Sequence, residues 1–128
     1  MLPSQFRLRR TADVATVRQL GRRWQHPLIA LFVYTQSHEV SSSSRFAFSV
    51  GRHIGKATRR NRVKRRLREI VRHHLDRLEP GYDCLFVVRS GAVMASHEEL
   101  EKAVVQQLIR AGVINDGKSN PGSEGIVS

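Results

Sequence analysis

The pattern of apolar and polar residues along the chain predicts three strands. Residues 28–35 form a continuous run of aliphatic and aromatic side chains, which is typical of a buried strand. Residues 45–50 instead alternate, with both phenylalanines on the apolar side, as in a strand that turns one face to the core. Residues 82–89 form a third apolar run. Because four serines at 41–44 connect the first two strands, we expect a turn or mobile loop there and a hairpin between these strands.

Apolar residues at spacings of three and four predict helices before and after these strands. A short helix is expected from Thr11, whose hydroxyl can cap it, and Gly21 would end it. A long helix is expected from about Thr58 to Leu78, shortly before Pro80. Its apolar stripe would pack on a sheet, while arginines recur on the opposite side.

A last helix begins at a capping box, in which the side chains of Ser96 and Glu99 accept hydrogen bonds from each other's backbone N–H groups, and Gly112 would end it. The predicted order is therefore αββαβα, a single compact α+β domain with helices packed on a sheet. We assign this domain to residues 1–114. The polar, glycine- and serine-rich residues 115–128 are expected to form a disordered tail.

Composition narrows the class of protein. With 128 residues, 40% of them apolar, the chain has enough material for one core. Its longest apolar run is far below the roughly 20 residues of a membrane span, and no signal peptide is evident, so we expect a cytoplasmic protein that does not bind membranes. The one cysteine, Cys84, lies in an apolar run. That placement favours a buried thiol over a nucleophile, and a single cysteine excludes an internal disulfide.

Positive charge is concentrated in one part of the chain. The sequence carries 22 Lys and Arg against 11 Asp and Glu, a net charge of +11. Residues 45–72 alone hold eleven cations and one anion, whereas residues 73–128 are slightly acidic. Many of these cations fall at the start of the long predicted helix, where the helix dipole disfavours each by about 0.3–1 kcal/mol. A segment that tolerates this cost indicates an external polyanion, so the sequence favours nucleic-acid binding.

An ordered motif leads from a glycine-bordered loop into the basic helix. It reads Gly55-Lys56-Ala57, then Arg60-Asn61-Arg62, Val63-Lys64-Arg65 and Arg68-Glu69. The motif resembles the RNR signature of the bacterial ribonuclease P protein component, and the resemblance extends over roughly residues 7–113. It implies a fold similar to the second domain of a small-subunit ribosomal protein, with a left-handed strand–helix–strand crossover.

The resemblance also implies the protein subunit of a ribonucleoprotein endoribonuclease. In this family a small basic protein binds a large catalytic RNA, and the complex removes the 5′ leader from precursor tRNA. The catalytic centre lies in the RNA, which also holds most of the Mg²⁺. We therefore expect no catalytic residue, metal ligand or organic cofactor in the protein, and one monomer per RNA.

Two groups of site residues follow from the resemblance. The first, called the RNR face, would contact the catalytic RNA and consists of Arg52, Lys56, Ala57, Arg59, Arg60, Asn61, Arg62, Lys64, Arg65 and Arg68. The second would line a cleft that receives the single-stranded leader, between the first helix and the sheet, and consists of Val14, Arg18, Phe32, Tyr34 and Phe48. Relatives often carry phenylalanines where this chain has Val14 and Arg18, so we expect the Arg18 guanidinium to stack on a base or bind a phosphate. Each of the three aromatic residues also has an ordinary interpretation as part of the core.

Other chemistry fits the sequence less well. His73 and His74 are adjacent and point in different directions on a helix, which argues against a metal site. The acidic residues at 98–101 are explained by capping of the last helix, which argues against a two-metal nuclease within the protein. A ribosomal-type or RNA-chaperone protein fits the charge equally well. A DNA-binding regulator is a third alternative, although no helix-turn-helix or zipper accompanies the basic helix.

Overall fold

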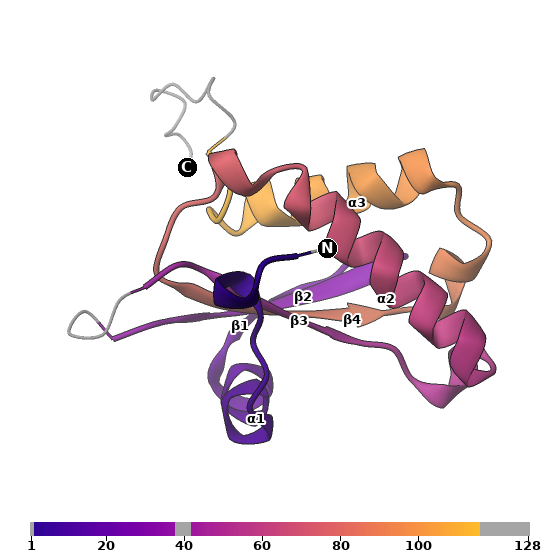
Figure 1. Ribbon diagram of the computed structural model, residues 1–128, viewed down its shortest axis with the longest axis horizontal. Coiled ribbons are helices and arrows are strands. Elements are labelled where there is room, and N and C mark those ends of the chain that lie inside the picture. The colour runs from indigo at the N-terminus through magenta and orange to yellow at the C-terminus, as the bar shows by residue number, and fades with distance from the viewer. Residues whose placement is uncertain (1, 38–41, 116–128) are drawn as a thin grey trace.

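A four-stranded sheet separates two helical layers of unequal size (Figure 1). In their order across the sheet, the strands are β1 (Arg22–Trp24), β2 (Ile29–Thr35), β4 (Tyr82–Val88) and β3 (Arg45–Ser49). The helices are α1 (Thr11–Leu20), α2 (Ala57–Arg72) and α3 (His97–Arg110). Helices α2 and α3 cover one face and α1 lies against the other. This computed structural model describes residues 2–37 and 42–115.

The sheet confirms the predicted α+β class but corrects its strand pairing. Strand β2 is antiparallel to both β1 and β4, whereas β3 is parallel to β4. Strand β4 therefore lies between β2 and β3, and the predicted hairpin of those two strands is wrong. Five of the seven β4 residues are buried, which suits a central position between the two helical layers. Strand β1 is an addition to the predicted αββαβα order, because its Arg-Arg-Trp sequence carries no apolar alternation.

The main core lies between the sheet and the pair α2 and α3. The apolar residues of α2 that recur at spacings of three and four are buried there, and α3 contributes a matching apolar side. The buried side chains of the two helices are Val63, Leu67, Ile70 and Val71 from α2, and Leu100, Ala103, Val104, Gln107 and Leu108 from α3. Full burial of one large aliphatic side chain stabilises the fold by about 1.5–3 kcal/mol, so this layer holds α2 in place.

Helix α2 ends earlier than the spacing predicts. It stops at Arg72 rather than at Leu78, and the chain continues through a 3₁₀ turn, η4 (Leu75–Arg77). The N–H of His74 bonds to the carbonyl of Val71 at 2.9 Å, three residues back, which tightens the last turn. Leu75 and Leu78 still pack against the core in this conformation, so their helical spacing is kept without an α-helix.

The capping residues predicted for α1 and α3 are confirmed at the start of α3 and the end of α1 but not at the start of α1. The capping box of Ser96 and Glu99 is present at α3. At α1 the N-cap is Arg10, so the prediction that Thr11 caps this helix is wrong; Thr11 is its first helical residue. Gly21 does end α1, and a side chain there would lie 2.5 Å from the carbonyl oxygen of Val17, so the sharp turn into β1 needs a glycine.

Two segments next to β3, the N-terminal segment beside it and the serines before it, make more defined contacts than their sequences indicate. The N-terminal segment runs beside β3, where the N–H of Leu8 bonds to the Phe46 carbonyl at 2.9 Å. Ser44 is 1% exposed; its hydroxyl donates to the carbonyl of Glu79 at 2.6 Å and accepts from the N–H of Tyr82 at 3.0 Å. The last serine of the run is therefore buried and joins the start of β3 to the residues around the start of β4. Ser41 lies outside the described residues, as does the part of the predicted tail from residue 116 onward.

Candidate nucleic-acid interface

The RNR motif begins at a backbone conformation that requires glycine. Gly55 has φ of 132°, which L side chains rarely adopt, and it joins the 3₁₀ turn η3 (Arg52–Ile54) to α2. The chain enters α2 through Lys56, which caps the helix without a side-chain hydrogen bond. A hollow of about 360 Å³ lies beside this helix start and is lined by Gly55, Lys56, Thr58, Arg59 and Arg62. Free backbone N–H groups and three cations thus meet at one place, which suits a phosphate.

The cations of the RNR face are without protein counter-charges in the described part of the chain. Within residues 2–37 and 42–115, no ion pair involves any of its eight Lys and Arg residues. Two other α2 cations do have protein partners. Arg72 pairs with Glu69 at 2.9 Å and is the largest cause of the lowered pKa of that carboxyl, about 2. Arg66 donates to the carbonyl of Ala95 at 3.4 Å. The cations of this helix therefore divide into those that serve the fold and those left for a ligand.

Residues of the RNR face do not all point the same way. Asn61, Arg62 and Arg65 are exposed on the outer side of α2, whereas Lys64 and Arg68 are half-buried and turn toward β3. Arg60 is also half-buried, and its Nε is buried without a hydrogen-bond partner among the described residues. A buried donor without a partner is costly, so this conformation of Arg60 carries an unsatisfied N–H group.

A second and larger hollow joins α2 to α1 across the edge of the sheet. It has a volume of about 600 Å³ and is called the β3 hollow here. Its cations come from three parts of the chain: Arg7 and Arg9 from the N-terminal segment, Arg18 from α1, and Lys64 and Arg68 from α2. The predicted RNA-binding helix and the predicted leader cleft are therefore parts of one continuous basic surface.

The sheet surface under α1 is apolar and incompletely covered. Val17 of α1 is fully buried against Leu8 and Leu85, which fixes the helix on the sheet. Around this contact, Val14, Phe32 and Tyr34 are only partly buried. We call this surface, with its partly exposed side chains, the α1 face. It offers flat apolar groups beside cations, the combination on which single-stranded bases stack.

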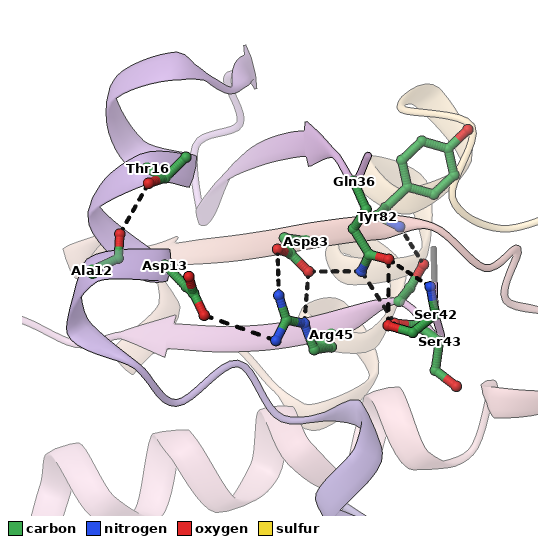
Figure 2. Close-up of polar contacts among 10 residues, drawn as sticks. Ala12, Asp13, Thr16, Gln36, Ser42, Ser43, Arg45, Tyr82 and Asp83 are labelled. Carbon is green, nitrogen blue, oxygen red and sulfur yellow. Dashed lines mark hydrogen bonds and ion pairs between the residues drawn. The ribbon is translucent and has the colours of Figure 1, made fainter. Parts of the chain in front are cut away.

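The α1 face is bordered by a polar network that holds its charges in place (Figure 2). Arg45 forms an ion pair with Asp83 at 2.7 Å and lies 3.9 Å from Asp13 of α1. At the other end of β3, Nη2 of Arg18 donates to the hydroxyl of Ser49 at 3.3 Å. Arg45 is thus neutralised, whereas the one partner of the Arg18 guanidinium among the described residues is a neutral hydroxyl, so Arg18 is available to an anion.

Phe48 lies apart from the other predicted leader residues. Its ring stacks on Phe86 with centroids 5.8 Å apart and packs on the α2 side of the sheet, while Phe32 and Tyr34 lie on the α1 side. Phe48 nevertheless lines the β3 hollow together with Val14 and Arg18. The structure therefore brings Val14, Phe32 and Tyr34 together and places Phe48 at the rim across β3.

Sequence reasoning missed several residues of this surface. Arg7 and Arg9 line the β3 hollow but belong to a segment without periodicity, and their only signal is the basic charge of the N-terminal region. The Arg45–Asp83 pair joins residues far apart in the sequence. No local pattern indicates such a pair, although an acidic residue inside an apolar strand is a signal that it needs a partner.

His74 and Cys84, two other residues that the sequence singled out, are engaged or buried within the fold. His74 contacts Glu101 at 3.1 Å and Arg77 at 3.2 Å. Cys84 is fully buried, and burial raises the pKa of its thiol well above the ordinary value, with a further contribution from Asp83. Among the described residues there is no group of three or more His, Cys, Asp or Glu that could hold a metal. None of their helices is long and apolar enough to cross a membrane.

An α+β domain with a basic helix, most of whose cations form no ion pair among the described residues, and with an apolar, cation-bordered sheet face is typical of an RNA-binding protein. The chain matches the family Ribonuclease P over residues 2–112. The ribonuclease P protein component of Herpetosiphon aurantiacus is 36% identical over 118 residues, which cover 92% of this chain and 93% of that protein.

Solved structures agree with this assignment. The RNase P protein of Staphylococcus aureus superimposes with a TM-score of 0.77 at 22% identity, covering 86% of this chain and 98% of that one, and shares the fold. The RNase P protein of Thermotoga maritima gives a TM-score of 0.73 at 26% identity over 81% and 96% of the two chains. The chain belongs to the ribonuclease P protein family: it is a protein subunit of the ribonucleoprotein endonuclease that processes the 5′ end of tRNA, and its partner is the ribonuclease P RNA.

Proposed function

We propose that the RNR face binds the catalytic RNA and that the α1 face guides the 5′ leader of precursor tRNA. The observation that carries this proposal is the β3 hollow, which joins the two surfaces and is lined by cations from both. An RNA strand that crosses β3 would remain close to positive charge throughout. Tyr34, Phe32, Val14 and Arg18 are the side chains we assign to the leader, with Phe48 at the rim of its path.

The protein acts in this proposal by reducing repulsion between two RNAs. If about six phosphates are neutralised, the logarithm of the affinity falls with the logarithm of salt concentration with a slope near −4 to −5. Reduced repulsion also lowers the Mg²⁺ concentration that the complex needs. We assign the Mg²⁺ ions to the RNA, and one protein monomer to each RNA. The protein groups bind and orient the substrate, while the cleavage chemistry takes place in the RNA.

The test is cleavage of precursor tRNA at low Mg²⁺. We compare bacterial ribonuclease P RNA alone, protein alone and the reconstituted holoenzyme, and we expect cleavage only when both subunits are present. The triple variant R60A/N61A/R62A should abolish the stimulation. The matched control is R72A, which removes an arginine of the same helix that is already paired with Glu69, and it should retain the stimulation.

Two outcomes would contradict the proposal. One is an absence of stimulation under conditions in which a known ribonuclease P protein stimulates the same RNA. The other is cleavage by the protein alone after repurification, which would place an active site in the protein. Titration of the protein against the RNA, read as the equivalence point of holoenzyme activity, tests the one-to-one stoichiometry.

A further inference from the structure

Three arginines from separate parts of the fold meet near β1, the edge strand at the opposite end of the strand order from β3. Arg23 lies on β1, Arg89 follows β4, and Arg110 ends α3. All three contact Gln25, the residue after β1. Nη1 of Arg110 donates to its backbone carbonyl at 3.0 Å, and Nη1 of Arg89 lies 3.4 Å from its Oε1. These four residues are called the Gln25 cluster.

The Gln25 cluster contains too few acceptors for its donors. In one orientation of the Gln25 amide, Oε1 accepts from Arg89; in the reversed orientation, Oε1 accepts from Nη2 of Arg23 and from its Nε at 2.9 Å. One amide oxygen can face only one of these two guanidinium groups, and the other then faces the amide NH₂, which is itself a donor. The arrangement therefore leaves guanidinium N–H groups open to an additional acceptor in either orientation.

The surroundings of the cluster favour an anion. Among the described residues, no ion pair involves Arg23, Arg89 or Arg110. The pKa of His26 lies below its ordinary value, first because its ring is partly buried and then because of the Arg110 charge. A hollow of about 280 Å³ adjoins Arg89 and is lined by Gln25, His26 and Pro27.

Protein contacts hold the cluster in place. Gln107 of α3 is fully buried, and its Nε2 donates to the carbonyls of Trp24 at 2.7 Å and Ile29 at 3.2 Å. Its Oε1 accepts from Nη1 of Arg110 at 2.6 Å. A buried amide thus joins α3 to the end of β1 and orients Arg110, one of the three guanidinium groups, before any ligand binds.

The cluster continues the α1 face. Arg23 pairs with Phe32 in the register of β1 and β2, and its guanidinium lies 6.0 Å from the centre of the Phe32 ring. The strand order places β1 at one edge of the sheet and β3, next to the RNR motif, at the other. An RNA strand that enters over β3 and crosses the α1 face would therefore reach Arg23 as it leaves the sheet.

We propose that Arg23, Arg89 and Arg110 bind a phosphate of the precursor leader, beyond the nucleotides that lie on the α1 face and farther from the cleavage site. This inference rests on the proposed path of the leader. The same single-stranded RNA leader would thus lie on the α1 face and then reach the β1 edge. Cleavage efficiency should therefore depend on leader length in a way that the α1 face alone would not give.

The test uses the reconstituted holoenzyme and precursors whose leaders lengthen by one nucleotide at a time. Single-turnover cleavage at subsaturating holoenzyme reports kcat/KM for each precursor. The variants are R23Q and R89Q, and the matched control is R22Q, the adjacent arginine of the same strand, which lies over Trp24 instead of Phe32. Arg23 and Arg89 are exposed, so neither substitution disturbs the core.

We expect all proteins to cleave short-leader precursors equally. Once the leader reaches the cluster, kcat/KM of the wild type and of R22Q should rise, while R23Q and R89Q should lag by roughly 2- to 5-fold, the range for exposed ionic contacts. The salt slope for long-leader binding should decrease by about 0.7 for each variant, as for one contact to a single strand.

Three results would overturn the inference. A loss that is equal at every leader length would assign the cluster to the catalytic RNA. Identical behaviour of R23Q, R89Q and R22Q would mean that the cluster binds no phosphate. If the wild type itself gains nothing from any leader, the proposed leader path fails together with this inference. In the first two cases the wild type still responds to the leader, so the two failures are distinguishable.

Discussion

Arg45 and Asp83 face each other in register across the parallel strands β3 and β4 and form a two-point ion pair. Nε of Arg45 lies 2.9 Å from Oδ1 of Asp83, and Nη2 lies 2.7 Å from Oδ2. The Asp83 side chain is 8% exposed and that of Arg45 is 32% exposed. Gln36 donates a further bond of 2.8 Å to Oδ1 and also bonds to Ser42 and Ser43 (Figure 2). One carboxylate thus joins β3, β4 and the segment after β2.

Replacement of Arg45 should destabilise the fold. In R45M the buried Asp83 carboxylate would keep, among the described residues, only the Gln36 bond, so the free energy of unfolding should fall by about 1–3 kcal/mol. Urea unfolding measures this change. The control is R72M, which breaks the exposed pair with Glu69 and should cost less than about 1 kcal/mol. An equal decrease in the free energy of unfolding of the two variants would show that the buried Arg45–Asp83 pair stabilises the fold no more than the exposed pair does.

Gly55→Ala should impair both stability and RNA binding. The φ of 132° disfavours any L side chain by about 1–3 kcal/mol, and the new Cβ would lie 3.1 Å from Cδ of Arg59. The control is Gly112→Ala, because Gly112 also has a positive φ of 79° but lies after α3 with open space around it. Both variants should unfold at lower urea concentration, and only Gly55→Ala should also weaken binding to ribonuclease P RNA. Equal RNA binding by the two variants would contradict the role of this turn.

Arg65 and Arg72 should differ in their contribution to salt-dependent binding. Arg65 is exposed without an ion pair in the described part of the chain, so R65Q should reduce the salt slope for ribonuclease P RNA by about 0.7–0.9. Arg72 already pairs with Glu69, so R72Q should change the slope less. Titrations of labelled RNA at several salt concentrations give both slopes. A larger effect from R72Q would mean that the RNA binds the C-terminal end of α2, which would contradict the proposed RNR face.

Arg18→Ala should weaken binding of precursor tRNA more than binding of mature tRNA. Its guanidinium reaches across the edge of the α1 face to Ser49 and has no carboxylate partner among the described residues. Removal of one exposed contact should cost roughly 2- to 5-fold in holoenzyme affinity for the precursor. Gln19→Ala, one position along the same helix, serves as the control. An equal loss for precursor and mature tRNA would exclude a leader contact for Arg18.

Cys84 should be unreactive in the folded protein. Burial raises the pKa of its thiol, so the thiolate that attacks alkylating reagents is scarce at pH 8. Iodoacetamide should modify the protein in urea but not under native conditions, and mass spectrometry would detect the adduct. Because folding raises this pKa, the thiol's contribution to stability is complete below the unfolded pKa of about 8.5 and is lost as the pH rises through the folded value. Rapid native alkylation would contradict the buried position.

Local patterns were sufficient to predict most helices and the basic motif. The capping box at Ser96 and the apolar stripe through Val63 and Leu67 depend on residues three or four positions apart, so the chain determines them by itself. Charge is also a sequence property, and the concentration of cations in residues 45–72 by itself indicates nucleic-acid binding.

Tertiary structure decided which strands pair and which charged groups meet. An alternating pattern tells which side of a strand is buried but not which strand lies beside it, so β4 between β2 and β3 could not be predicted from the serine connector. The same holds for Arg23, Arg89 and Arg110, which only the folded chain brings to Gln25. Helix and strand patterns arise from the geometry of neighbouring residues, whereas pairing and charge clusters arise from contacts between distant ones.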